Sequence, residues 1–279
     1  MLSASLSAAF GAAPSLALAL LSILYVLASL YVYISLVHQI SVRTSDRIGA
    51  DAPARRFGLP EAILATLLIL FLLVNVGASI SRPSIQFTAQ NIVANLVFTV
   101  FVVLVVVTFL YLRGFDIGAL GGLFRISFVR VLSTGAILLF FAYPLVLFCD
   151  VITQRLFGGS SNRQSIVEFF SGSRTIEQRI IIIVFAVAIA PIVEEFVFRF
   201  FIYGVLKRYV GCLLGVILSS LLFAAAHAHF PSFVPLFVLG SCLAIAYEWS
   251  GSILVSMTMH SLFNSLTLIA LAFPEIISQ

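Results

Sequence analysis

Residues 190–199 read APIVEEFVFR, and they lie inside an apolar run that extends from Ile180 to Tyr203. Such a run is long enough to cross a bilayer, which takes about 20 apolar residues in a helix. An ionisable side chain at the bilayer centre costs at least about 2.5–3.5 kcal/mol, so Glu194, Glu195 and Arg199 need partners or a water-filled cavity. The stretch therefore predicts a transmembrane helix that carries a polar functional site.

Helical spacing assigns the two neighbouring carboxylates to different roles. Glu195 and Arg199 are four residues apart and share a helix face, whereas Glu194 lies about 100° further round the helix. We therefore expect Glu195 to pair with Arg199 as structural support and Glu194 to face a cavity. Pro191 removes the backbone hydrogen bond to Val187, which predicts a bend in the helix just before the carboxylates.

The composition excludes an ordinary soluble domain. The 279 residues are 62% hydrophobic and 9% charged, whereas soluble domains are about 25% charged. We predict an all-α, polytopic membrane helix bundle without a soluble domain. The bilayer is therefore an expected partner. The basic residues form no dense cluster and lie between the apolar runs, so nucleic acid is not an expected partner. Cys149, Cys212 and Cys242 lie in apolar segments at unrelated spacings, which indicates neither a disulfide framework nor a thiolate metal site.

About eight apolar runs meet the length criterion for transmembrane helices. No Lys or Arg precedes Arg43, so the first run is expected to stay as a helix rather than to be cleaved as a signal peptide. The predicted spans lie near residues 15–37, 60–80, 91–112, 131–152, 179–205, 211–228, 233–248 and 252–272.

The connections between these runs predict a topology and a domain boundary. Odd-numbered connections carry more Lys and Arg than even-numbered ones, which places them in the cytoplasm and both termini outside. The polar segment 153–178 separates accessory N-terminal helices, residues 1–152, from a catalytic core, residues 153–279. Capping-box spacing at its centre predicts a short interfacial helix around residues 166–170.

Polar side chains gather in the second half of the chain. His227 ends the sixth run and His260 lies in the eighth, at a depth comparable with that of Glu194, and Asn264 shares a helix face with His260. In peptide hydrolysis, Glu194 and His227 would hold and deprotonate a water, while His260 and Asn264 would donate to the oxyanion. The remaining histidines, His38 and His229, are interpreted as packed or interfacial.

A second chemistry uses the same atoms. Glu194, His227 and His260 form a two-histidine, one-carboxylate set of the kind that binds catalytic zinc, so zinc or another divalent metal is an alternative cofactor. The chain lacks an H-E-x-x-H motif. Metal-assisted catalysis and direct activation of water by glutamate therefore both stay open.

Three motifs resemble those of a known family. Glu194 to Arg199 matches E-E-x-x-x-R, Phe223 to His227 matches F-x-x-x-H, and His260 to Asn264 matches H-x-x-x-N. In this order, on successive helices, they resemble the motifs of the CAAX-protease and bacteriocin-processing family, which includes the Ras-converting CAAX prenyl endopeptidases. The resemblance covers about residues 180–268.

The resemblance implies an intramembrane endopeptidase of about eight helices in a bacterial-type plasma membrane. Glu194 would be the catalytic glutamate, His227 its water-holding partner, and His260 and Asn264 the remaining catalytic residues. Structural support would come from Glu195, Arg199 and Phe223. The implied partner is a peptide or protein substrate, and a prenylated CAAX tail is the family's best-known substrate type.

Two rival functions use the same residues. A proton-coupled transporter also places carboxylates and histidines within the membrane, but it predicts inverted repeats, whereas the polar groups here crowd into one half of the chain. A non-proteolytic member of the same family would bind a membrane partner with all four catalytic positions retained. A cleavage assay that compares the wild type with Glu194→Gln separates these functions from a protease.

Overall fold

The computed structural model describes residues 16–46, 57–81, 89–157 and 176–273. Within these ranges the chain forms helices and no strand, so the predicted all-α class is confirmed. The first elements are α2 (Leu16–Asp46), α3 (Leu59–Ser81), α4 (Ala89–Leu112), α5 (Ile117–Gly121) and α6 (Phe128–Phe157). They are followed by α8 (Ile176–Ile183), η2 (Val184–Ile189), α9 (Ala190–Glu195), η3 (Phe196–Tyr203), α10 (Gly204–Val210), α11 (Cys212–Ala226), η4 (Phe230–Ser232), α12 (Phe233–Ser250) and α13 (Ile253–Ala272).

The apolar helices account for all eight predicted runs. Six described segments are long and apolar enough to cross a membrane, and two shorter apolar helices cover Leu96–Leu112 and Cys212–Ala226. The protein is therefore an integral, multi-pass membrane protein. Its outer faces carry exposed apolar side chains such as Leu24 and Phe101, as lipid-facing surfaces do. The short helix predicted around residues 166–170 lies outside the described residues.

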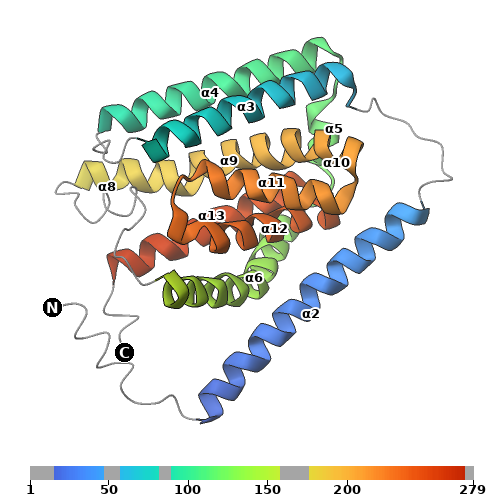
Figure 1. The fold of residues 1–279 in the computed structure, drawn as a ribbon. Helices are drawn as coiled ribbons and strands as arrows, with labels where there is room; N and C mark the ends of the chain where they lie inside the picture. The colour runs from blue at the N-terminus through green and yellow to red at the C-terminus, as the bar shows by residue number, and fades with distance from the viewer. Residues whose placement is uncertain (1–15, 47–56, 82–88, 158–175, 274–279) are drawn as a thin grey trace.

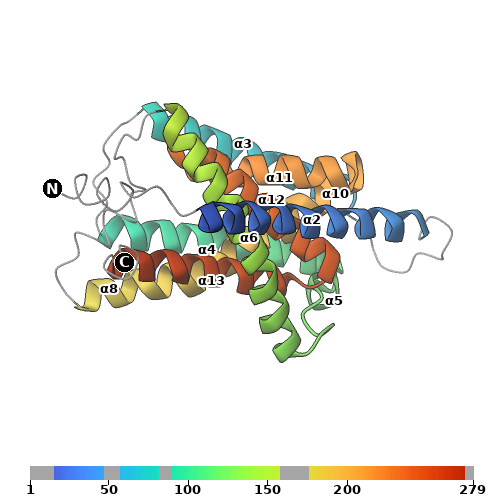
Figure 2. The ribbon, with the colours of Figure 1, turned by 90° about the horizontal axis from the view of Figure 1, so that it is seen from below.

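One continuous helical rod runs through the bundle and carries the acidic motif. From α8 to α10 the segments η2, α9 and η3 join end to end (Figure 1), and together residues 179–210 form a single candidate span. Both η2 and η3 are π-helical, so they flank α9 with wider turns. The rod packs against α11 on one side and against α13 on another, as the view from below also indicates (Figure 2).

The odd-numbered connections meet at one end of the bundle. Arg43 after the first span donates from Nη1 to the Trp249 carbonyl at 3.0 Å. Lys207 at the end of the rod pairs with Glu248 at the end of α12. The structure therefore places these connections together, as predicted, although the side of the membrane that they face stays a prediction.

The buried core lies where α6, α11, α12, α13 and η3 meet. Side chains from each helix in this core are fully or almost fully buried, among them Phe201, Phe223, Leu243 and Met259. Gly240 on α12 lets that helix approach α11 closely, since a Cβ at this position would lie 3.1 Å from Phe223 Cδ1. N-terminal helices contribute to the same core, so the proposed catalytic half is supported by the first half of the chain.

Candidate active site

The predicted ion pair between Glu195 and Arg199 is present. Arg199 Nη1 lies 3.2 Å from Glu195 Oε1, and both side chains are almost completely buried. The guanidinium also donates from Nη2 to the Gly240 carbonyl at 3.3 Å and lies 4.1 Å from the centroid of the Phe223 ring. A carbonyl and an aromatic face thus complete the surroundings of a buried cation.

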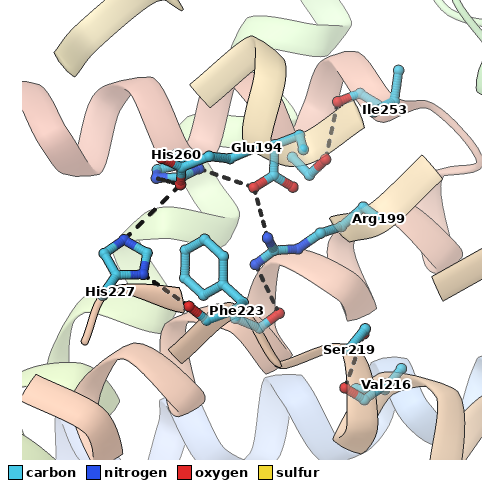
Figure 3. A network of polar contacts seen from close by, with 11 residues as sticks. Glu194, Arg199, Val216, Ser219, Phe223, His227, Ile253 and His260 are labelled. Atoms are coloured by element: carbon cyan, nitrogen blue, oxygen red, sulfur yellow. Dashed lines mark hydrogen bonds and ion pairs between the residues drawn. The ribbon is translucent and has the colours of Figure 1, made fainter. Parts of the chain in front are cut away.

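The same carboxylate also holds His260. Glu195 Oε1 lies 2.9 Å from His260 Nδ1, and the imidazole is buried. A carboxylate paired with arginine accepts hydrogen bonds, so Nδ1 carries a proton and donates it. The other ring nitrogen, Nε2, is therefore directed into the site, toward Glu194 (Figure 3).

His227 is oriented by the end of its own helix. α11 ends at Ala226, and His227 Nδ1 lies 2.8 Å from the Phe223 carbonyl. A carbonyl oxygen only accepts, so Nδ1 donates, and in the neutral ring Nε2 keeps its lone pair. The F-x-x-x-H spacing has a physical reason here, because a helix leaves its last carbonyls without backbone donors. Phe223 thus supports the site through its carbonyl and through its ring.

Glu194 faces both histidines. Its Oε2 lies 4.0 Å from His227 Nε2 and 3.9 Å from His260 Nε2 (Figure 3). These separations are too long for direct hydrogen bonds, but they fit a bridging water. Oε2 itself is buried and makes no hydrogen bond, although 29% of the whole side chain is exposed. Glu194 therefore lies within reach of both histidines through one water, while its orientation toward a cavity stays a prediction.

Asn264 has a different partner from the one expected. Its Nδ2 donates to the carbonyl of Ala186, in η2, at 2.8 Å. The structure brings Glu194, His227 and His260 together, whereas the Asn264 amide uses one of its two N–H groups on the backbone. His229 bonds through Nδ1 to Ser232 Oγ at 2.8 Å, within its own turn, as suits an interfacial residue.

The three candidate metal ligands do not fit a zinc site in this arrangement. Ligands in a tetrahedral zinc site lie about 3.4 Å from one another, because each is about 2.1 Å from the ion. The Glu194 oxygen is further than this from both Nε2 atoms. No group of three or more His, Cys, Asp or Glu side chains in the described residues is arranged to hold a metal ion.

Two backbone carbonyls contribute to the site without a signal in the sequence. The Gly240 carbonyl binds Arg199, and the Ala186 carbonyl binds Asn264. Because every residue has a carbonyl, only the three-dimensional arrangement reveals these two. Sequence spacing also did not indicate that Glu195 serves His260, since the two residues are 65 positions apart.

Comparisons with known proteins find similarity to proteases over the same region. Residues 176–266 match the sequence model of the type II CAAX prenyl endopeptidase Rce1-like family. The membrane-embedded CAAX protease MroQ of Staphylococcus aureus (strain USA300) is 31% identical over 131 residues, which cover 43% of this chain and 50% of MroQ. The chain thus matches about half the length of that relative. No solved structure matches the chain significantly.

Proposed function

We propose, from the match of residues 176–266 to the model of the type II CAAX prenyl endopeptidase Rce1-like family, that this protein is an intramembrane endopeptidase. One observation supports this proposal above the others. Glu194 Oε2 is buried and makes no hydrogen bond, and it lies 4.0 Å from His227 Nε2 and 3.9 Å from His260 Nε2. The Nδ1 atom of each of these rings is hydrogen-bonded to another group of the protein. A separation of this size between a carboxylate and two histidines suits one bridging water.

Water activation is assigned to Glu194 and His227. A water about 2.8 Å from both Glu194 Oε2 and His227 Nε2 fits the gap between these atoms, and both atoms accept its hydrogens. Glu194 takes one proton as the water oxygen attacks the peptide carbonyl carbon. The carbonyl π electrons then move to oxygen, and a tetrahedral intermediate forms.

Oxyanion stabilisation is assigned to His260. Its Nδ1–H donates to Glu195, so in this role the ring carries a second proton and Nε2–H is the donor to the oxyanion. An oxyanion role for Asn264 stays part of the proposal through its second amide N–H. When the intermediate collapses, protonated Glu194 returns its proton to the amine nitrogen, the C–N bond breaks, and the carboxyl product forms.

The substrate class follows from the surroundings of the site. The site lies on helices that cross the bilayer, so we propose a peptide bond in a membrane-associated peptide or protein. A prenylated CAAX tail is the first substrate to test, because the similar MroQ is described as a CAAX protease. In this proposal residues 1–152 form the accessory part and residues 153–279 the catalytic part, in a bacterial-type plasma membrane.

The decisive experiment compares the purified wild type with Glu194→Gln. A fluorescence-quenched farnesylated peptide reports cleavage in detergent micelles, and we expect Glu194→Gln to abolish it while the protein stays folded. Asp150→Asn is the matched control, since this carboxylate lies on α6 and bonds to Gln154 on its own helix. Normal cleavage by Glu194→Gln would show that the assignment of the general base is wrong.

Chelation tests how the water is activated. We expect cleavage to survive exhaustive treatment with a zinc chelator, because the proposed steps use only protein groups. His260→Ala should then lower kcat more than it raises KM, since the oxyanion forms only during the reaction. Stoichiometric bound zinc, together with activity that a chelator removes and zinc restores, would instead make His260 a metal ligand.

A further inference from the structure

Pro191 leaves one carbonyl of the rod without a backbone donor. In the π-helical turn η2 each N–H donates to the carbonyl five residues earlier, and Ala190 donates to Phe185 in this way. The next bond in that register would run from residue 191 to Ala186, but proline has no N–H. The donor that an α-helix would supply to Ala186 is Ala190, which is already used. The Ala186 carbonyl therefore has neither of these backbone donors.

The side chain of Asn264, on the neighbouring helix α13, donates a hydrogen bond to this carbonyl. Its Nδ2 lies 2.8 Å from the Ala186 oxygen. Ala186 is buried in a small apolar cluster with Ile182 and Leu268, so the carbonyl lies in surroundings where an unpaired polar group is costly. In membrane proteins, side chains of adjacent helices commonly satisfy the backbone groups that a proline leaves open.

The bond joins the two elements on which the proposed active site depends. Ala186 and Glu194 belong to the same rod, on either side of the proline, and Asn264 follows His260 by one turn of α13. We infer that Asn264 is a positioning residue, which clamps η2 to α13 through the carbonyl that Pro191 leaves open. This clamp holds Glu194 Oε2 at 3.9 Å from His260 Nε2. Its effect on catalysis rests on the proposed function, whereas the clamp itself is a property of the fold.

A double-mutant cycle tests the clamp without any assay of activity. Pro191→Ala restores an N–H at position 191, which can donate to the Ala186 carbonyl in the π-helical register of η2. In the wild-type background Asn264→Ala should lower Tm by about 2–4 °C, as the loss of one buried interaction does in a protein of this size. In the Pro191→Ala background the same change should lower Tm by less than half as much.

Ser265→Ala is the matched control for this cycle. The Ser265 hydroxyl donates to the Ser261 carbonyl within α13, at 2.7 Å, so its loss should have the same effect in both backgrounds. If Asn264→Ala does not accumulate as folded protein, Asn264→Leu takes its place with the same criterion, because it has a similar size and no hydrogen-bond donor. Accumulation of the variant only in the Pro191→Ala background would support the clamp.

Kinetics test whether the clamp contributes to catalysis in addition to the proposed donor role of Asn264. Misplaced catalytic groups can cost up to about a hundredfold in rate, so Asn264→Ala should reduce kcat, and Pro191→Ala should recover part of that loss. An equal loss of kcat in both backgrounds, with no change in Tm, would overturn the inference. If the wild type cleaves nothing, the Tm cycle still decides the question, so failure of the proposed function and failure of the clamp are distinguishable.

Discussion

At the scale of single residues, one buried carboxylate binds two side chains of the site. Glu195 Oε1 lies within 3.2 Å of Arg199 and within 2.9 Å of His260. Glu195→Gln should therefore lower the free energy of unfolding by about 3–5 kcal/mol, because it leaves a buried guanidinium without its partner. It should also lower kcat, because the His260 ring loses the acceptor that orients it. Thermal unfolding and steady-state kinetics on the same preparation measure both effects.

The neighbouring carboxylate provides the contrast. Glu194→Gln should leave Tm within about 1 °C of the wild type, because its Oε2 has no hydrogen bond to lose and the amide keeps the shape. Arg199→Gln should resemble Glu195→Gln in stability. Equal destabilisation by Glu194→Gln and Glu195→Gln would contradict the division of roles between the two residues.

Sequence spacing predicted the contacts within one helix and not those between helices. The pair Glu195 and Arg199 follows from a separation of four residues, and the structure confirms it. The contact of Glu195 with His260 depends on how the rod packs against α13, which spacing along one helix does not contain. Asn264 shares a helix face with His260, as predicted, but its partner is a backbone carbonyl that residue types do not reveal.

At the scale of helices, Gly240 sets the distance between α11 and α12. A methyl group there would lie 3.1 Å from Phe223 Cδ1 and 3.3 Å from Ser220 Cα. Gly240→Ala should therefore destabilise the protein by about 1–3 kcal/mol through overpacking. It should also reduce kcat, because the Gly240 carbonyl binds Arg199 and the Phe223 carbonyl orients His227.

Gly77→Ala is the control for that substitution. Gly77 lies in α3, where a Cβ would meet nothing within 4 Å, so alanine should be neutral or slightly stabilising. Chemical denaturation and cleavage assays of the two variants side by side measure the difference. A Gly240→Ala protein that matched Gly77→Ala in both assays would contradict the role of close packing at α11 and α12.

The sequence predicted where the helices lie, but it did not predict the hydrogen-bond register within each helix. The eight predicted runs agree with the described helices because hydrophobic length and burial determine both. Pro191 predicted a bend in the helix just before the carboxylates. The structure accommodates that proline with the π-helical turn η2, and such a turn changes hydrogen bonds without changing the apolar character that marks a span.

At the scale of the whole molecule, the connections at one end of the bundle support a single topology. Contacts of Arg43 with Trp249 and of Lys207 with Glu248 require that their connections lie on the same side. Reporter fusions after residue 43 and after residue 208 should therefore both report the cytoplasm, in line with the positive-inside rule. Opposite reports from these two fusions would contradict the fold as well as the predicted orientation.

The pairing of Glu195 with both Arg199 and His260 also determines the electrical balance of the site. In the proposed mechanism His260 is doubly protonated, so the negative charges of Glu194 and Glu195 balance the positive charges of Arg199 and His260 before the reaction. When Glu194 takes a proton and the substrate oxygen becomes negative, the total is unchanged. In this step the negative charge moves by a few ångströms, from Glu194 to the substrate oxygen, and the net charge of the site stays zero. Turnover should accordingly respond little to transmembrane voltage, which sets such a hydrolase apart from membrane proteins that carry charge across the bilayer.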